Sequence, residues 1–308
     1  MQLIRGIQNI QPADHGCVLT IGNFDGVHLG HKRVLEALVA QAKQLNTVAA
    51  VMVFEPQPQE MFAKENSPAR LTRLRDKYNL LKKLGVQRLI CVNFNEEFAS
   101  LSAETFIEQL LIKKLGIKHL IIGDDFRFGQ YRTGDFTMLN DYGQRFNFAV
   151  TDTQSYKMAE CRISSTEIRK ALEEDDLTTA EAMLGRPYAI TGRVIHGEKN
   201  GRKFGFPTAN VLLKRLVSPV AGVYAVSVMS NQEQHYGVAN IGCRPTLNGI
   251  RQQLEVHIFD FNQNLYGQQI EVTMLKKIRA EKKFESIDAL ISQIQKDSEQ
   301  ARLFINKR

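Results

Sequence analysis

Two histidines lie at the end of a glycine-containing segment near the N-terminus. They are three residues apart, a spacing that places both side chains on one face of a helix. The segment runs from Ile21 to His31, and Gly30 lies between His28 and His31. It follows an apolar run and opens a helical pattern, so backbone amides are expected to converge where a phosphate group could bind. Imidazoles so placed can donate hydrogen bonds to phosphate oxygens as charge builds during displacement at phosphorus. Gly30 would let a ligand approach the backbone closely.

The residues alone leave two other interpretations of this segment open. It can be a tight turn that carries two exposed histidines, or a two-histidine metal site whose other ligands lie elsewhere. Because HxGH is a short motif, it does not decide among these interpretations by itself.

A second segment with possible phosphate chemistry runs from Gly197 to Asn210. It combines three glycines with the basic pair Arg202 and Lys203, and so offers mobile backbone donors near positive charge. Such a loop can cover a nucleotide. It lacks the GxxxxGK[ST] pattern of a Walker A loop, and a long hairpin between strands is the alternative.

Strands alternating with helices are predicted around the histidine segment. Helical patterns fill the gaps, one of them through Leu71, Leu74, Tyr78, Leu81 and Leu84. This alternation favours βαβ units, a Rossmann-like parallel sheet, and ligand binding at the carboxyl ends of the strands. The predicted strands are 18–22, 48–54, 88–92, 119–123 and 148–151.

After about residue 185 the pattern changes to strands separated by Gly, Asn and Pro turns. An antiparallel β-barrel or sandwich is expected, closed by a helix that starts at Ser286 and carries apolar Ile287, Leu290, Ile291, Ile294 and Ala301. We therefore predict an α/β domain over 1–185 and a β-barrel domain over 186–308. The predicted strands of the second domain are 188–195, 222–229, 234–241, 254–261 and 269–275.

The composition is that of a folded protein without membrane segments. The chain has 308 residues, 43% hydrophobic and 24% charged, which argues against disorder. Its apolar runs are far shorter than the roughly 20 residues that span a bilayer, and no secretory signal is readable, so a cytoplasmic location is expected. The scattered cysteines at 17, 91, 161 and 243 indicate neither a disulfide framework nor a zinc site.

The net charge of +7 is concentrated in the second domain. Residues 1–185 carry 22 basic and 23 acidic residues, and 186–308 carry 18 and 10, which gives −1 and +8. The basic residues form short groups that do not alternate with aromatics as in single-strand binders. A solvated basic face or a phosphate-bearing small substrate is expected, with no nucleic acid and no membrane partner.

The histidine segment, read as GNFDGVHLGH with the later ISSTEIR, resembles the HxGH nucleotidyltransferase superfamily. From the residues alone, Ser165 and Thr166 could simply cap the helix 167–172. The resemblance implies instead that the histidines and the ISSTxIR segment hold the triphosphate of ATP, with His28 and His31 catalytic. The ATP-binding residues that it implies are Gly22, Asn23, Phe24, Asp25, Gly30, Ser164, Ser165, Thr166 and Arg169.

Two further segments, 54–58 and 123–129, resemble the flavin-adenylylating branch, the FAD synthetase domain of bacterial bifunctional riboflavin kinase/FAD synthetases. Both follow predicted strands. Phe126 and Phe128 could flank a planar ring while Arg127 pairs with a phosphate, although aromatics at strand ends are commonly core residues. Gln57 stands where many relatives carry histidine. The flavin-binding residues implied are Pro56, Pro58, Asp125, Phe126, Arg127 and Phe128.

The second domain resembles the riboflavin kinase family through GFPTAN at 205–210. The resemblance implies that Thr208 and Asn210 hold a divalent metal and that Glu255 is the general base for the ribityl hydroxyl. From the residues alone, Glu255 would be a solvated strand carboxylate. The remaining implied residues are Gly201, Lys203, Gly205 and Pro207 for ATP and Arg279 for the flavin.

The two resemblances together predict a bifunctional transferase. Its kinase domain would convert riboflavin and ATP to FMN, and its first domain would join AMP from ATP to FMN to give FAD, with Mg²⁺ at both steps. The alternative is a nucleotidyltransferase for another phosphorylated acceptor whose barrel is a non-catalytic, possibly RNA-binding, module. The sequence does not determine the oligomeric state, rate constants, domain orientation or passage of FMN between sites.

Overall fold

The computed structural model divides the chain into two compact units, described separately. Unit 1 is Met1–Pro68 with Thr72–Ser165, and unit 2 is Ala69–Leu71 with Thr166–Arg308. The residues that the structure describes are 1–63, 67–123, 126–153, 157–158, 161–197, 201, 205–213, 217–246 and 249–307.

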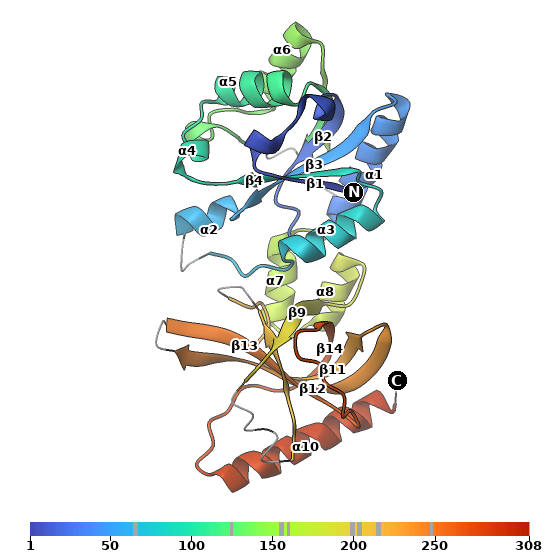
Figure 1. Ribbon diagram of the computed structural model, residues 1–308, viewed down its shortest axis with the longest axis vertical. Coiled ribbons are helices and arrows are strands. Elements are labelled where there is room, and N and C mark those ends of the chain that lie inside the picture. Colours follow the sequence, from blue (N-terminus) through green and yellow to red (C-terminus); the bar gives the residue numbers. More distant parts are fainter. Residues whose placement is uncertain are drawn as a thin grey trace. The chain divides into compact units, whose positions relative to one another are not determined.

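Unit 1 is built on a six-stranded parallel sheet in the order β1-β4-β3-β2-β5-β6 (Figure 1). The sheet confirms the predicted Rossmann-like architecture, and five strands lie where the apolar runs predict them. The short edge strand β1 was not predicted. The strands are β1 (Gln2–Arg5), β2 (Cys17–Ile21), β3 (Val48–Glu55), β4 (Arg88–Asn93), β5 (Ile117–Gly123) and β6 (Ala149–Thr153).

Helices cover both faces of this sheet. Leu35 and Leu38 of α1 (Leu29–Gln44) and Leu81 of α3 (Leu74–Lys83) form one core with the strands. The π-helical segment η4 (Phe106–Lys114) and α6 (Phe136–Phe146) form the core of the other face. The other elements of unit 1 are η1 (Ile7–Asn9), η2 (Pro12–Asp14), α2 (Pro58–Ala63), α4 (Glu96–Ala99), α5 (Ala103–Thr105), η5 (Gln130–Arg132), β7 (Lys157–Met158) and β8 (Cys161–Arg162).

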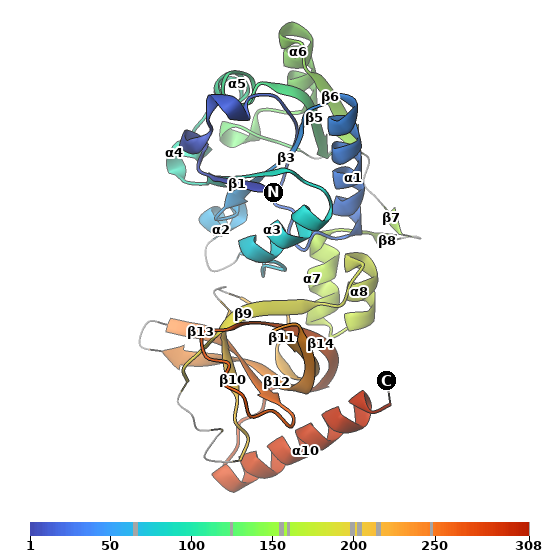
Figure 2. The same ribbon diagram turned by 45° about the vertical axis from the view of Figure 1, so that its right-hand side comes forward.

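Unit 2 is a closed barrel in the order β10-β13-β12-β11-β14-β9, with every pairing antiparallel; Figure 2 labels the six strands. It confirms the predicted barrel, but the four-residue strand β10 was not predicted. The elements are α7 (Ser165–Glu173), α8 (Leu177–Leu184), β9 (Ala189–Ile195), β10 (Ala209–Leu212), β11 (Gly222–Ser230), β12 (Glu233–Thr246), β13 (Gly249–Ile258), β14 (Gln269–Arg279) and α10 (Ile287–Ile305).

The C-terminal helix α10 lies along one side of the barrel, against β11, β12 and β14 (Figure 2). Ser286 caps its N-terminus by accepting a hydrogen bond from the Ala289 N–H at 3.2 Å. Ala301 is buried, as the apolar pattern predicts, but Ile287 is 59% exposed. Leu290 and Ile294 line a cavity of the barrel, so part of the apolar face of α10 is open to a ligand.

Two of the four cysteines, Cys17 and Cys91, are buried, and the side chains of the other two lie outside the described residues. Burial raises the pKa of the Cys17 thiol to about 12. Among the described helices, none is both long and apolar enough to cross a membrane.

Candidate active sites

The turn between β2 and α1 holds His28 by a specific hydrogen bond. His28 is the N-cap of α1, and its Nδ1 accepts from the His31 backbone N–H at 3.3 Å. The neutral His28 ring must then carry its proton on Nε2. A Cβ on Gly30 would lie 3.1 Å from that ring, so Gly30 accommodates the His28 imidazole rather than simply leaving room for a ligand.

Two other parts of the turn are built into the fold. Phe24 is buried with a φ of +47°, and its ring centroid lies 4.9 Å from that of His31. The Asp25 carboxylate is buried and accepts from the Thr72 N–H at 2.9 Å and from the Thr72 hydroxyl at 3.2 Å. Asp25 thus orders the turn. Gly22 follows β2 and donates its N–H to Met52 O at 3.1 Å, and Asn23 is partly buried.

The ISSTEIR segment begins beside this turn within unit 1. The Ser165 hydroxyl donates to the Asp25 carbonyl at 2.9 Å, and Ile163 O lies 3.5 Å from a Cβ built on Gly30. Ser164, which stands between Ile163 and Ser165 in the sequence, is partly buried. The tertiary structure therefore brings Ser165 to the histidine turn across 140 residues of sequence. Thr166 and Arg169 lie in α7 and are counted with unit 2, where Arg169 Nε donates to Ala69 O at 2.6 Å.

The histidine rings form a stacked, partly buried pair, with centroids 3.6 Å apart and planes 20° apart. Within the described part of the chain, Nδ1 of His31 is buried and has no hydrogen-bond partner. Burial lowers the pKa of His31 well below its usual value, and His28 and Lys77 lower it further. The orphan Nδ1, when it carries the ring proton, could donate a hydrogen bond to an anionic ligand.

This pKa predicts that acid destabilises the chain through His31. Because the folded-state pKa lies below the unfolded value of about 6.5, the unfolded chain binds more protons and the free energy of unfolding falls as pH drops below about 6.5. For one proton bound only by the unfolded chain, the loss between pH 7.5 and 5.5 is at most about 1.4 kcal/mol. His31→Gln removes the titrating group, so urea unfolding of the variant should lose less stability over this interval. Equal pH dependence for both proteins contradicts the assignment.

Lys77 is a residue at this site that sequence reasoning missed. It is buried at 1% exposure on α3, and its charge acts on His31. A signal was present in the sequence, because Lys77 lies three residues after Leu74 and four before Leu81, on the apolar face of its helix. A buried cation on such a face requires a polar environment.

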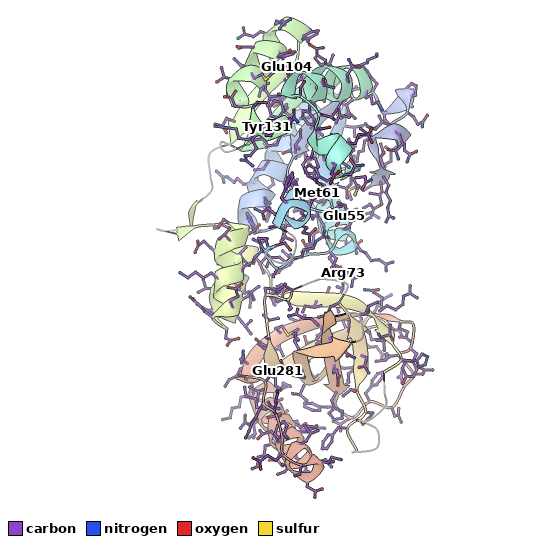
Figure 3. All side chains as sticks on the ribbon, turned by 90° about the vertical axis from the view of Figure 1, so that its left-hand side faces the viewer. Glu55, Met61, Arg73, Glu104, Tyr131 and Glu281 are labelled. Carbon is purple, nitrogen blue, oxygen red and sulfur yellow. The ribbon has the colours of Figure 1, made fainter. Side chains whose placement is uncertain are left out.

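The residues expected to bind flavin in unit 1 lie in two segments that follow strands. Pro56 has a cis bond with Glu55, and Pro58 begins α2; Figure 3 labels Glu55 at the end of β3 and Met61 on α2. Gln57 is buried, and its Nε2 has no partner among the described residues. The flavin role of these residues stays a prediction.

The second of these segments is partly core. Phe126 and Phe128 stack with centroids 5.6 Å apart, and Phe128 is buried against Phe106. The exposed Arg127 donates from Nη1 to Phe126 O at 2.9 Å. Asp125 lies outside the described residues.

In unit 2, one face of β13 lines a cavity of about 380 Å³. Leu254, Val256 and Ile258 are buried on one side of the strand, while Gln253, Glu255 and His257 line the cavity on the other. This agrees with the two-residue alternation of a strand and places Glu255 where a substrate could reach it. The volume is within the range of small-molecule sites.

Barrel register places Glu255 between two asparagines. It is directly opposite Asn210 of β10 on one side and Asn240 of β12 on the other. Directly opposed residues have Cβ atoms about 4.5–5.5 Å apart. The Asn210 amide is buried, and its Oδ1 accepts a hydrogen bond from Gln253 Nε2. The expected metal-binding residue and the expected base therefore come from neighbouring strands, 45 residues apart in sequence.

Thr208 lies where two cavities meet. It lines the cavity that contains Glu255 and also a second cavity of about 440 Å³, whose walls include Pro207, Phe261 and Tyr266. His257 Nδ1 is 2.9 Å from Pro207 O and ties this segment to β13.

The glycines of this loop have different surroundings. Gly201 lines the first cavity, and its carbonyl accepts from the Phe206 N–H at 2.8 Å. Gly205 has a φ of +84°, a conformation that favours glycine. Lys203 lies outside the described residues.

Arg279 ends β14 and lines the first cavity, where its guanidinium is paired with Asp297 of α10. Asp297, like Lys77, was missed by sequence reasoning. It lies three residues after Ile294 and four before Ala301, on the apolar side of α10. Asn240 and Gln253 were also missed, although Gln253 could have been found from its alternation with Glu255.

The fold alone places unit 1 in the Rossmann-like class of α/β proteins. The same chain also contains an antiparallel barrel with two adjoining cavities. Family models narrow this class: the model described as FAD synthetase matches residues 10–167, and the model described as riboflavin kinase matches residues 184–305. The chain belongs to the family of bifunctional riboflavin kinase/FMN adenylyltransferases.

Individual relatives support the same family. The chain is 53% identical over 306 residues to the bifunctional riboflavin kinase/FMN adenylyltransferase of Escherichia coli K12, covering 99% of this chain and 98% of the relative. It is 54% identical over 307 residues to the protein of the same description from Haemophilus influenzae, covering 99% and 100%. A crystal structure described as a macrolide-efflux protein from Streptococcus pneumoniae is 30% identical, with a TM-score of 0.80 over 98% of this chain and 99% of that one.

Proposed function

We propose that this chain phosphorylates riboflavin with ATP to FMN in the barrel and joins AMP from a second ATP to FMN in the parallel-sheet domain, releasing pyrophosphate. The observation that carries the kinase assignment is the position of Thr208 between two cavities. Phosphoryl transfer needs a donor and an acceptor that meet at one point. We assign the cavity of Glu255 to the flavin and the other cavity to ATP.

The walls of the first cavity suit a flavin. Val223, Val238, Leu290 and Ile294 supply apolar surface for a planar ring, while Glu255 lies with Thr208 at the reacting end. In this mechanism Glu255 accepts the proton of the ribityl hydroxyl as that oxygen attacks the γ-phosphorus of ATP. Asn210, opposite Glu255, is held in place by Gln253.

The donor set also suits Mg²⁺. Thr208 and Asn210 offer a hydroxyl and an amide oxygen, the hard ligands that Mg²⁺ prefers alongside substrate phosphates. Among the described residues no cluster of three or more His, Cys, Asp or Glu side chains could hold a metal, so phosphate oxygens and water would complete the coordination. The ion would neutralise phosphate charge during transfer. The resemblance assigns Gly201, Lys203, Gly205 and Pro207 to ATP; of these, Pro207 lines the cavity that we assign to ATP, whereas Gly201 lines the adjoining flavin cavity.

For the adenylyltransferase we propose that the histidine pair donates hydrogen bonds to the triphosphate as the FMN phosphate attacks the α-phosphorus. His28 offers Nε2–H, and the orphan Nδ1 of His31 can bind a phosphate oxygen when that nitrogen carries the proton. The resemblance also assigns Ser164, Ser165, Thr166 and Arg169 to ATP binding in this step, and we propose Pro56, Pro58 and Phe126 for the flavin.

The proposed domain limits are 1–185 and 186–308. The FAD synthetase match ends at residue 167 and the riboflavin kinase match begins at 184, so α7 and α8 connect the two matches. Compactness alone groups these helices with the barrel. Because ATP, an intracellular nucleotide, is a substrate of both steps, we also propose a cytoplasmic location.

The function is tested with the full chain, riboflavin, ATP and MgCl₂. Flavins are separated over time, and FMN should appear first and FAD later. A parallel reaction with excess EDTA should stop both products if Mg²⁺ acts at both steps. Unchanged riboflavin in the Mg²⁺ reaction contradicts the kinase assignment, and FMN without later FAD contradicts the adenylyltransferase assignment.

A further inference from the structure

A bidentate ion pair joins the barrel to α10 at the wall of the kinase cavity. Arg279 Nε lies 3.0 Å from each carboxylate oxygen of Asp297, and Nη2 lies 2.8 Å from Oδ2. The Asp297 side chain is 4% exposed and that of Arg279 is 22% exposed. Both residues line the cavity that contains Glu255. This pair is therefore buried on its carboxylate side and accessible on its guanidinium side.

Further contacts restrict how Arg279 can turn. Gln293 Nε2 donates to Asp297 Oδ1 at 2.9 Å, and Arg279 Nη1 donates to the Ala280 carbonyl at 2.9 Å. A guanidinium has five N–H groups in one plane. The contacts with described residues use Nε and one N–H of each terminal nitrogen. One N–H on each terminal nitrogen is left, which is the planar fork that binds paired acceptor atoms.

The barrel register shows which end of a flavin this fork would meet. One row of paired residues runs around the barrel from Glu255 through Asn240 and Val223 to Arg279. These residues lie on four consecutive strands, so about 14 Å of barrel wall separates Glu255 from Arg279 at about 4.8 Å per strand. The apolar residues Leu290 and Ile294 of α10 line the same cavity as Arg279. Arg279 is thus remote from the phosphoryl-transfer end and close to the apolar wall.

We propose that Asp297 is a positioning residue of the kinase site that holds Arg279 so that its free fork binds the carbonyl-bearing edge of the isoalloxazine ring. The proposal rests on the proposed kinase function. Asp297 does not touch the substrate itself. Its negative charge, fixed by Gln293, orients the guanidinium against the side of the cavity that takes the ring. Binding of the ring then depends on Asp297, whereas the phosphoryl-transfer step at Glu255 does not.

A purely structural role makes a different prediction. If the pair only fastens α10 to the barrel, then breaking another ion pair between α10 and the barrel should raise the riboflavin KM equally. The chain offers such a pair: Arg302 of α10 contacts Asp260, which follows β13, through two hydrogen bonds of 2.9 and 3.0 Å. Neither residue lines the kinase cavity. Arg302→Gln is therefore the matched control.

The test measures Asp297→Asn in the full chain. Asparagine keeps the shape and one acceptor oxygen but removes the charge. We expect the riboflavin KM of the kinase step, and the riboflavin Kd from flavin fluorescence, to rise by about 10- to 100-fold, the effect of misplacing a binding group by about 1 Å. The kcat and the KM for ATP should stay close to those of the unchanged chain. Arg302→Gln should leave all four quantities near their original values.

Further variants keep the result decisive. Arg279→Lys should reproduce the rise in riboflavin KM, and combining it with Asp297→Asn should add little, because both act through one contact. If Asp297→Asn does not fold, Arg279→Lys and Gln293→Ala carry the test. An unchanged riboflavin KM in folded variants overturns the proposal, as does an equal rise in Arg302→Gln. Failure of the unchanged chain to make FMN identifies a failure of the kinase assignment instead.

Discussion

Glu255→Gln is expected to lower the turnover of riboflavin to FMN by about 10² to 10⁴-fold, the usual contribution of a general base. Glutamine keeps the size of the side chain and can still form hydrogen bonds, but it cannot accept the proton of the attacking hydroxyl. Riboflavin and ATP should therefore bind nearly as before, and the loss should be in kcat. Glu255 lies in the cavity wall opposite Asn210, so its loss should act at the proposed point of phosphoryl transfer.

The measurement uses steady-state FMN formation, with thermal unfolding to confirm that the variant folds. FAD formation from supplied FMN is an internal control, because it takes place in the other domain and should persist. Glu271→Gln is the matched control. Glu271 is an exposed carboxylate on β14 of the same barrel, outside the two kinase cavities, and its neutralisation should change little. Near-normal FMN production by the folded Glu255→Gln variant would contradict the assignment of Glu255 as the general base.

His28→Asn and His31→Gln are each expected to lower FAD formation from FMN by about 10² to 10³-fold, the usual effect of losing one preorganised donor to transition-state charge. The choice of asparagine at position 28 separates catalysis from folding. Asparagine is a good N-cap and can accept the His31 N–H, but it lacks the Nε2–H that we assign to the phosphate. Glutamine at position 31 keeps much of the volume that packs against Phe24.

Formation of FMN from riboflavin should continue at the normal rate in both variants. Glu36→Gln on the exposed side of the same helix is the control, since it removes only a surface pair with Lys32, whose loss costs about 0.3–0.5 kcal/mol. If His28→Asn makes FAD at the full rate, then His28 serves only as the N-cap of α1. Equal loss of both activities in a folded variant contradicts the division of work between the domains.

Local patterns were sufficient to predict the elements with strong periodicity. The strands β2 to β5 each bury several apolar residues, and α10 carries apolar residues at helical spacing, so the signal for these elements is contained in a few neighbouring residues. The turn with His28 and Gly30 was also readable, because a strand end, a glycine and a helix start are adjacent in sequence. The short strands β1 and β10 have four residues each and carry no such signal; pairing with distant strands stabilises them.

Local residue patterns define the class of each domain and the residue types at each site, whereas the fold establishes which of those residues come into contact. Ser165 binds the Asp25 carbonyl, Glu255 pairs in register with Asn210, and Asp297 holds Arg279. Each contact depends on strand register or helix docking, which many weak apolar contacts set together, and no local pattern encodes it. The charged residues Lys77 and Asp297 interrupt apolar helix faces, so the sequence marks them as unusual, but only the fold supplies their partners and hence their roles.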